Sequence, residues 1–224
     1  MTSNREDYLK AIYEDGGLEL YVSNQKIAKK LGVSAASVTE MLGKLQENGF
    51  VEYLPYHGSK LTELGYEACI DVLRSHRIWE VFLMQHLGYS FREAHEEAEL
   101  LEHSSPTRMI ERLEHFLGFP KTCPHGASIP QKGDYSCDAI DLLKLTQLKS
   151  GDQAIIRQLS EDGNFLDYIS KTPLALNQII TLIEVGEFEG AITFQQGEDM
   201  ITVSHKAGSM IFVEPINTTC SNKV

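Results

Sequence analysis

Cysteine, basic residues and long apolar runs are all scarce in this sequence. The 224 residues include four cysteines, at positions 69, 123, 137 and 220, which are too few and too scattered for a disulfide framework. No apolar run reaches the roughly 18 residues needed to span a bilayer, and the polar segment from Met1 to Asp7 lacks signal-peptide character. We therefore expect a soluble cytoplasmic protein with no membrane partner, whose cysteines are free thiols or metal ligands.

The charge balance excludes one broad class of function. Lysine and arginine total 20 against 32 acidic residues, giving a net charge of −12. General coating of nucleic acid needs clustered basic residues, so we exclude it. Residues 22–62 are an exception to the acidity, with five lysines against three glutamates. Acidic residues gather around Glu93 to Glu114, where we weigh a solvated helix face against a cation site.

The first 65 residues have the pattern of a winged helix-turn-helix. A short helix is expected after Ser23, followed by a turn at Gly32 and a second helix from Ala35 to Glu47 that Ser34 caps. Phe50 to Leu54 alternates like a strand, and a turn leads into a return strand, which together predict a hairpin wing. The helix after Ser34 is the candidate recognition helix. The candidate DNA-contacting residues are Ser34, Ala35, Ala36, Ser37, Thr39, Lys44 and Lys60. A small helical domain without a DNA role is the alternative.

The remainder predicts a mostly α-helical protein with a β C-terminal domain. A long helix is expected from Glu63 to His86, a helix from a capping box at Ser90 to His103, and another that Ser105 and Pro106 begin. From residue 145 onward, five short β-like runs separated by Gly and Asp turns predict a small β-barrel. We expect domains at residues 1–65, 66–140 and 145–216.

The most informative segment for chemistry runs from His95 to His103. His95, Glu99, Glu102 and His103 fall within roughly 100° of one another around a helix and border its apolar stripe. On the preceding helix, His76 and Glu80 are four residues apart and interrupt an apolar row. Carboxylates at such a border need protons or a cation. Nitrogen and oxygen donors favour manganese or iron(II), whereas an ordinary buried or surface histidine is the alternative for each position.

Two further motifs bear on the type of site. Cys123-Pro124-His125 offers a thiolate and an imidazole, although a buried thiol beside a loop histidine accounts for it equally well. His95-Glu96 begins the HExxH pattern of zinc peptidases, but the second histidine is replaced by Glu99. The sequence also has no glycine-rich phosphate loop and no serine nucleophile elbow. We therefore do not expect an enzyme.

Taken together, these residues resemble the diphtheria-toxin-repressor family of metal-dependent regulators, and in particular its manganese-responsive branch. The resemblance covers almost the whole chain. Its specific stretches are REDYLKAIYE, VSAASVTEMLGKLQENGFV, SHRIWEVFL, HEEAELLEH and FPKTCPHG. It implies a winged-helix DNA-binding domain, a helical metal-binding and dimerisation domain, and an SH3-like C-terminal domain.

The resemblance also implies two metal centres. The first would use Asp7, Glu99, Glu102 and His103, with His76 as a further contributor. The second would use Glu80, Cys123 and His125, completed by a C-terminal carboxylate, Glu161 or alternatively Asp162, and His95 falls at an ancillary position. Iron-responsive relatives have sulfur ligands where this chain has Asp7 and Glu99, so the resemblance implies Mn²⁺, with Fe²⁺ as the alternative. A binuclear manganese relative has an acidic residue where this chain has Lys10, which argues against a binuclear copy of that site.

We therefore expect a manganese-activated repressor that binds double-stranded operator DNA as a homodimer. The dimer is expected to use apolar positions of the long helix such as Trp79, Val81, Phe82 and Met84, although packing inside one subunit would account for them equally well. Two alternatives remain. One is a metal-binding sensor or adaptor that acts through proteins, and the other is a winged-helix regulator of an organic ligand.

Overall fold

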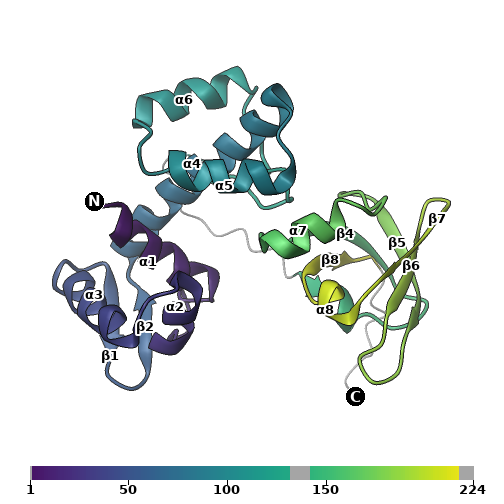
Figure 1. Cartoon of the computed structure of the whole chain (residues 1–224), viewed down its shortest axis with the longest axis horizontal. Coiled ribbons are helices and arrows are strands. Elements are labelled where there is room, and N and C mark those ends of the chain that lie inside the picture. The colour runs from purple at the N-terminus through teal and green to yellow at the C-terminus, as the bar shows by residue number, and fades with distance from the viewer. Residues whose placement is uncertain (1, 132–141, 217–224) are drawn as a thin grey trace, which may run out of the picture. The chain divides into compact units, whose positions relative to one another are not determined.

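The structure is a computed structural model that describes residues 2–131 and 142–216 (Figure 1). Its contacts divide the chain into two compact units. The first contains Met1–Trp79 and Glu97–Pro120, and the second contains Glu80–Glu96, Lys121–Ser128 and the C-terminal domain. Within residues 2–131 and 142–216, no helix has the length and apolar character required to cross a membrane. The predicted domain boundary at 140 and the residues Cys137 and Cys220 lie outside the described residues.

The N-terminal part of the first unit is a winged helix-turn-helix (Figure 1). Its elements are α1 (Ser3–Glu14), α2 (Asn24–Leu31), α3 (Ala35–Glu47), β1 (Val51–Leu54) and β2 (Gly58–Leu61). Ser23 and Ser34 cap α2 and α3 as predicted, accepting hydrogen bonds from the backbone N–H groups of Lys26 and Ser37. Gly58 has φ 115°, and a Cβ there would come within 2.1 Å of the Val22 carbonyl oxygen, so glycine allows the wing to approach the chain before α2.

One hydrophobic core joins the helices of this part to the start of the next helix. Leu9 and Ile12 of α1 pack with Val38 and Leu42 of α3 and with Leu73 of α4 (Glu63–Leu87), and all five side chains are almost fully buried. Burying each such side chain contributes roughly 1.5–3 kcal/mol. A restraint on α1 is therefore also a restraint on α3.

Two helices follow α4, namely α5 (Phe91–Leu101) and α6 (Thr107–Phe116). The capping box that begins α5 is confirmed, because Ser90 N–H donates to Glu93 Oε2 at 2.9 Å. The prediction that Ser105 caps α6 is wrong. Pro106 holds the N-cap position, and the Ser105 hydroxyl donates instead to the Leu101 carbonyl at 2.7 Å while accepting from Trp79 Nε1 at 2.8 Å.

The C-terminal domain is an antiparallel six-stranded sheet in the order β3-β8-β4-β5-β6-β7. Its strands are β3 (Leu143–Lys144), β4 (Gln153–Leu159), β5 (Ile179–Val185), β6 (Ile192–Gln196), β7 (Asp199–Val203) and β8 (Ile211–Pro215). The five predicted β-like runs (residues 153–159, 178–184, 190–195, 200–204 and 210–214) correspond to β4, β5, β6, β7 and β8, with ends that differ by at most about two residues. The sheet, with the 3₁₀ turn η1 (Leu145–Gln147), α7 (Gly163–Ile169) and α8 (His205–Gly208), encloses a core that includes Phe165, Leu166 and Phe194. The predicted combination of helical domains with an SH3-like C-terminal sheet domain is confirmed.

Candidate metal centres and DNA-binding surface

Two overlapping groups of candidate metal ligands lie in the first unit. Asp7 of α1, Glu102 and His103 form one group, and His76, Glu99 and Glu102 form the other, with the ligand atoms of each group within 4.8 Å of one another. The two groups share Glu102. The helical spacing predicted correctly that Glu99 and Glu102 lie together, but α5 ends at Leu101, so Glu102 and His103 lie in the turn that follows.

Hydrogen-bonded ion pairs connect α1 to the end of α5. His103 Nε2 is 2.8 Å from Asp7 Oδ1, and His103 Nδ1 is 2.6 Å from Glu6 Oε2. With a carboxylate at each ring nitrogen, the arrangement suits a doubly protonated imidazole. Burial lowers the pKa of His103, but hydrogen bonding to Glu6 and the charges of Glu102 and Asp7 outweigh it, so the pKa lies above its ordinary value of 6.5. Partial burial raises the pKa of Asp7 although His103 offsets part of that effect.

Lys10 is a member of this cluster whose burial among the candidate ligands the sequence did not reveal. Its side chain is buried, and Nζ lies 2.5 Å from Glu99 Oε1, 2.9 Å from Glu102 Oε2 and 3.4 Å from His76 Nδ1. Burial by itself would lower the pKa of Lys10, but the charges of Glu102, Glu99 and Glu14 outweigh it and raise the pKa above its ordinary value. Lys10 therefore carries a positive charge inside a group of candidate ligands.

A second group lies in the second unit and consists of Glu80, Cys123 and His125. All three are buried, and His125 Nδ1 is 3.8 Å from Cys123 Sγ and 3.3 Å from Glu80 Oε2. Among the described residues, His125 Nε2 is a buried nitrogen without a hydrogen-bond partner. A buried carboxylate, thiol and imidazole within reach of one ion fit a divalent transition metal, because such polar groups otherwise need partners.

The loop that carries Cys123 and His125 is held by backbone contacts within the second unit. Leu159 N–H donates to the His125 carbonyl at 2.8 Å. Gly126 has φ 87°, and a Cβ there would lie 1.9 Å from the Arg157 carbonyl oxygen. The Phe91 ring covers the imidazole of His125, with ring centroids 5.3 Å apart. The position of the His125 carbonyl therefore depends on the end of β4.

His95 and Glu161 were also predicted as ligands. His95 Nδ1 lies 3.2 Å from Glu80 Oε1, consistent with an ancillary position beside the second group. Glu161 lies between β4 and α7 and belongs to none of the ligand groups found among the described residues. Its alternative, Asp162, accepts a hydrogen bond from Phe165 N–H at 2.9 Å and caps α7. The C-terminal ligand therefore remains a prediction.

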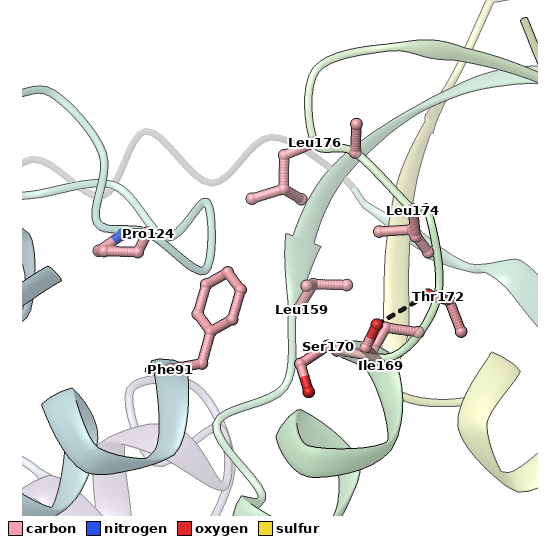
Figure 2. Close-up of a pocket in the computed structure, with 9 residues that line it drawn as sticks. Phe91, Pro124, Leu159, Ile169, Ser170, Thr172, Leu174 and Leu176 are labelled. Atoms are coloured by element: carbon pink, nitrogen blue, oxygen red, sulfur yellow. Dashed lines mark hydrogen bonds between the residues drawn. The ribbon is translucent and has the colours of Figure 1, made fainter. Parts of the chain in front are cut away.

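An apolar pocket of about 360 Å³ lies in the second unit (Figure 2). Phe91 and Pro124 line it together with leucines 159, 174 and 176, and its hydroxyl groups are those of Ser170 and Thr172. Both hydroxyls donate to backbone carbonyls, at 3.0 and 2.7 Å. The pocket therefore offers apolar surface, and neither of its hydroxyl groups has a hydrogen free to donate to an organic ligand.

The candidate DNA-contacting residues lie on α3 and the wing. Ser34, Ala35, Ala36, Ser37, Thr39 and Lys44 are exposed, and Lys60 is half-buried. Both lysines are paired within the chain, since Lys44 Nζ is 2.6 Å from Glu40 and Lys60 Nζ is 3.1 Å from Glu52. Lys60 also lies over the Tyr21 ring, 5.2 Å from its centroid. A DNA phosphate would have to compete with these carboxylates.

The fold and the clusters define a winged-helix DNA-binding protein with candidate metal ligands behind the recognition helix. Comparison with known families agrees, because the model described as "Iron dependent repressor, N-terminal DNA binding domain" matches residues 1–59. The model "Iron dependent repressor, metal binding and dimerisation domain" matches residues 62–131, and the FeoA domain model matches residues 143–215.

Individual relatives extend this likeness over the whole chain. A helix-turn-helix transcriptional regulator of Methanocaldococcus jannaschii is 38% identical over 122 residues, which cover 52% of this chain and 94% of that protein. The solved manganese regulator SloR is 36% identical, with a TM-score of 0.78 and coverage of 96% of this chain and 100% of that one. A manganese-dependent transcriptional repressor in complex with manganese is 30% identical, with a TM-score of 0.86 and coverage of 95% and 100%.

The chain therefore belongs to the iron-dependent repressor family, which is the diphtheria-toxin-repressor family of metal-dependent transcriptional repressors. This confirms the family resemblance seen in the sequence. Members of the family are DNA-binding regulators and not enzymes, as predicted.

Proposed function

We propose that this repressor is activated by Mn²⁺, binds operator DNA as a homodimer in the cytoplasm, and controls genes for metal uptake. The observation that carries the proposal is the position of Asp7. This residue belongs to the DNA-binding part of the chain, yet its carboxylate lies 2.8 Å from His103, which follows α5 of the metal-binding part. One candidate centre therefore draws ligands from both parts.

The proposed mechanism is a linkage between this centre and the recognition helix. α1 shares its core with α3, so a restraint on Asp7 reaches the residues that face DNA. A bound divalent ion supplies positive charge shared by Asp7, Glu102 and His103. These carboxylates then repel one another and DNA phosphates less strongly. Affinity for metal and affinity for DNA are expected to rise together, because coupling between two sites is reciprocal.

The donor atoms favour manganese at the first centre. Asp7, Glu99 and Glu102 supply carboxylate oxygens, and His76 and His103 supply imidazole nitrogens, so the donor set is rich in hard oxygen donors and contains no sulfur. Two solved relatives named for manganese support the choice, whereas the name of the family model keeps Fe²⁺ as the alternative. We assign the second centre to Glu80, Cys123 and His125, with His95 beside it and Glu161 as the predicted C-terminal ligand.

The proposed homodimer is supported by the dimerisation domain model and by exposed apolar side chains of the first unit. Leu100 of α5 and Met109 and Phe116 of α6 are 72%, 47% and 62% exposed. Trp79 and Val81, two of the predicted interface residues, are buried inside the single chain. Packing within one subunit therefore accounts for these two, and we place the dimer contact on the exposed apolar residues of α5 and α6.

Capture of genomic DNA tests the function as a whole. Chelator-treated protein is mixed with sheared DNA from the source organism, with and without Mn²⁺, and the retained DNA is sequenced. Enrichment of a few discrete promoter fragments only in the presence of Mn²⁺ is the expected result. A parallel sample with Glu102→Gln should retain none of these fragments. Measurable metal binding without any enrichment would contradict the proposal.

Two alternatives are less well supported. A sensor or adaptor acting only through protein partners would not need the winged helix, and the chain belongs to a family of DNA-binding repressors. A regulator of an organic ligand would need an effector site, but the hydroxyl groups of the apolar pocket in Figure 2 are committed to the backbone. Enrichment of the same fragments in chelator, without metal, would favour the organic-ligand alternative.

A further inference from the structure

The five lysines of residues 22–62 differ in their ion pairs. Three are paired with carboxylates of the chain, namely Lys30 with Glu14 at 2.8 Å, Lys44 with Glu40 at 2.6 Å and Lys60 with Glu52 at 3.1 Å. Lys26 and Lys29 of α2 are exposed and have no ion-pair partner among the residues that the structure describes. The uncommitted lysine charge of this segment is therefore concentrated on α2.

We propose that Lys26 and Lys29, the α2 lysine pair, bind phosphate groups of the operator backbone. The inference rests on the proposed function and deepens it, because it adds contacts to the same DNA outside α3 and the wing. A lysine ammonium binds a phosphate as a point charge, and such a contact fixes the position of the protein without reading the base sequence. The α2 lysine pair therefore supplies affinity and leaves base recognition to other residues.

The start of α2 adjoins the surface that is predicted to face DNA. Asn24, the first residue of α2, donates from Nδ2 to Thr39 Oγ1 at 3.0 Å and to the Tyr53 hydroxyl at 3.3 Å. Thr39 is an exposed candidate DNA-contacting residue of α3, and Tyr53 belongs to strand β1 of the wing. Lys26 follows two residues after Asn24, and Lys29 lies about one helical turn further along α2. Residues three apart on a helix are neighbours on its surface, so both lysines can face the same DNA backbone.

The charge pattern of α2 is unfavourable in the free protein and suits an anionic partner. Lys26 lies in the first turn of α2, where the backbone N–H groups already carry partial positive charge, and no acidic residue lies in that turn. Lys29 adds a like charge on the neighbouring surface of the helix. A DNA phosphate beside Lys26 would relieve both effects, because negative charge near a helix N-terminus is favourable. Lys29, in the last turn, is stabilised by the helix dipole, so Lys26 is the residue whose position most needs an anion.

Pairing within the chain distinguishes the lysines of α3 and the wing from the α2 lysine pair. Lys44 and Lys60 must each leave a carboxylate before they bind phosphate, and that carboxylate then stays near the DNA. Lys26 and Lys29 need no such exchange. Each lysine that neutralises a phosphate releases condensed counterions, which steepens the plot of log affinity against log salt concentration by about 0.9. The α2 lysine pair is therefore expected to contribute about 1.8 to the steepness of that plot.

Salt titrations of alanine variants test the proposal. Wild type, Lys26→Ala, Lys29→Ala and the double variant are titrated in Mn²⁺, by fluorescence anisotropy, with a captured operator fragment and with an unrelated duplex of the same length. Each single substitution should reduce the steepness of the salt plot by about 0.9, and the double variant by about 1.8. Affinity should fall by the same factor for the operator and for the unrelated duplex, because a phosphate contact carries no sequence information.

Two control variants separate the loss of a phosphate contact from a change in α2 itself. Lys30→Ala removes a neighbouring lysine of α2 that is already paired with Glu14, so it should leave the steepness unchanged. Lys26→Arg keeps the positive charge and should retain the wild-type steepness. Alanine is a strong helix former, so the alanine variants should keep the fold, which circular dichroism checks.

Unchanged steepness in the double variant, a reduction no larger than that of Lys30→Ala, or a loss of affinity confined to the operator would overturn the proposal. Absence of Mn²⁺-dependent operator binding by wild type would instead contradict the proposed function. The unrelated duplex tests the α2 lysine pair even in that case.

Discussion

Substitution of Glu102 by glutamine is the perturbation whose cost follows most directly from the structure. The Glu102 side chain is fully buried and lies 2.9 Å from Lys10 Nζ and 2.6 Å from His76 Nδ1. Glutamine keeps the shape but removes the negative charge, which leaves Lys10 with Glu99 as its remaining close carboxylate. Removing one partner of a buried ion pair costs about 3–5 kcal/mol, and we expect about 3 kcal/mol because Glu99 remains.

The single tryptophan provides the assay. Trp79 belongs to the first unit, so its fluorescence during urea unfolding in chelator reports that unit. A loss of about 3 kcal/mol lowers the urea midpoint by about 1 M for an m-value of about 3 kcal/mol/M. Glu97→Gln, on the exposed side of α5, is the matched control and should change stability by less than about 0.5 kcal/mol.

A double variant shows whether the loss comes from the ion pair. Lys10→Met combined with Glu102→Gln should cost less than the sum of the two single changes, because the second substitution removes the charge that the first leaves unpaired. The reasoning is refuted if Glu102→Gln is as stable as Glu97→Gln, or if the two single costs simply add.

Three further predictions concern metal and DNA. Mn²⁺ affinity should fall as pH decreases through the raised pKa of His103, by up to about tenfold per pH unit, because the protonated imidazole cannot bind metal. Equilibrium dialysis at several pH values measures this affinity, and an affinity that does not change with pH would contradict the prediction. Cys123→Ser should abolish the sulfur-to-metal absorption band of the Co²⁺-loaded protein, whereas a band that persists would remove Cys123 from the second centre. Lys44→Ala should reduce the steepness of the plot of log affinity for operator DNA against log salt concentration by about 0.9. Glu40→Gln should strengthen DNA binding, because it releases Lys44 from its ion pair. DNA titrations at several salt concentrations check both expectations.

Local signals made most of the fold predictable. Ser23, Ser34 and the Ser90–Glu93 box each place a polar side chain where free helix N–H groups need an acceptor, and all three caps are present in the structure. Alternation of apolar residues located the strands of the C-terminal sheet, because one face of each strand is buried.

Two local sequence signals did not lead to the correct prediction, one at the start of α6 and one at α7. Ser105 before Pro106 has the pattern of a helix start, but its hydroxyl binds Leu101 and Trp79 instead. α7 was missed although Asp162 is a good N-cap and Phe165, Leu166 and Ile169 have helical spacing, because the helix spans only seven residues. The role of Ser105 depends on contacts that become visible only in the folded chain, whereas α7 is too short for its helical spacing to be distinctive.

The candidate site was predictable where its residues are close in sequence. Glu99 lies on α5 and Glu102 follows three residues later, directly after the helix ends, so their proximity follows from the helical repeat. Their contact with Lys10 does not follow, because it joins residues about ninety positions apart through the packing of α1 in the first unit. A lysine beside apolar positions usually extends toward solvent, so its residue type alone did not indicate a buried cation.

Metal-dependent DNA binding by matched variants is the most direct test of the central claim, that a centre shared by Asp7 and the end of α5 controls operator binding. A promoter fragment captured with Mn²⁺ is titrated with wild type, His103→Ala and the control Glu97→Ala, over a range of free Mn²⁺, and binding is followed by fluorescence anisotropy. We expect wild type and Glu97→Ala to bind only as Mn²⁺ rises, and the folded His103→Ala variant to have lost that response. Binding by His103→Ala with an unchanged dependence on Mn²⁺ would contradict the account.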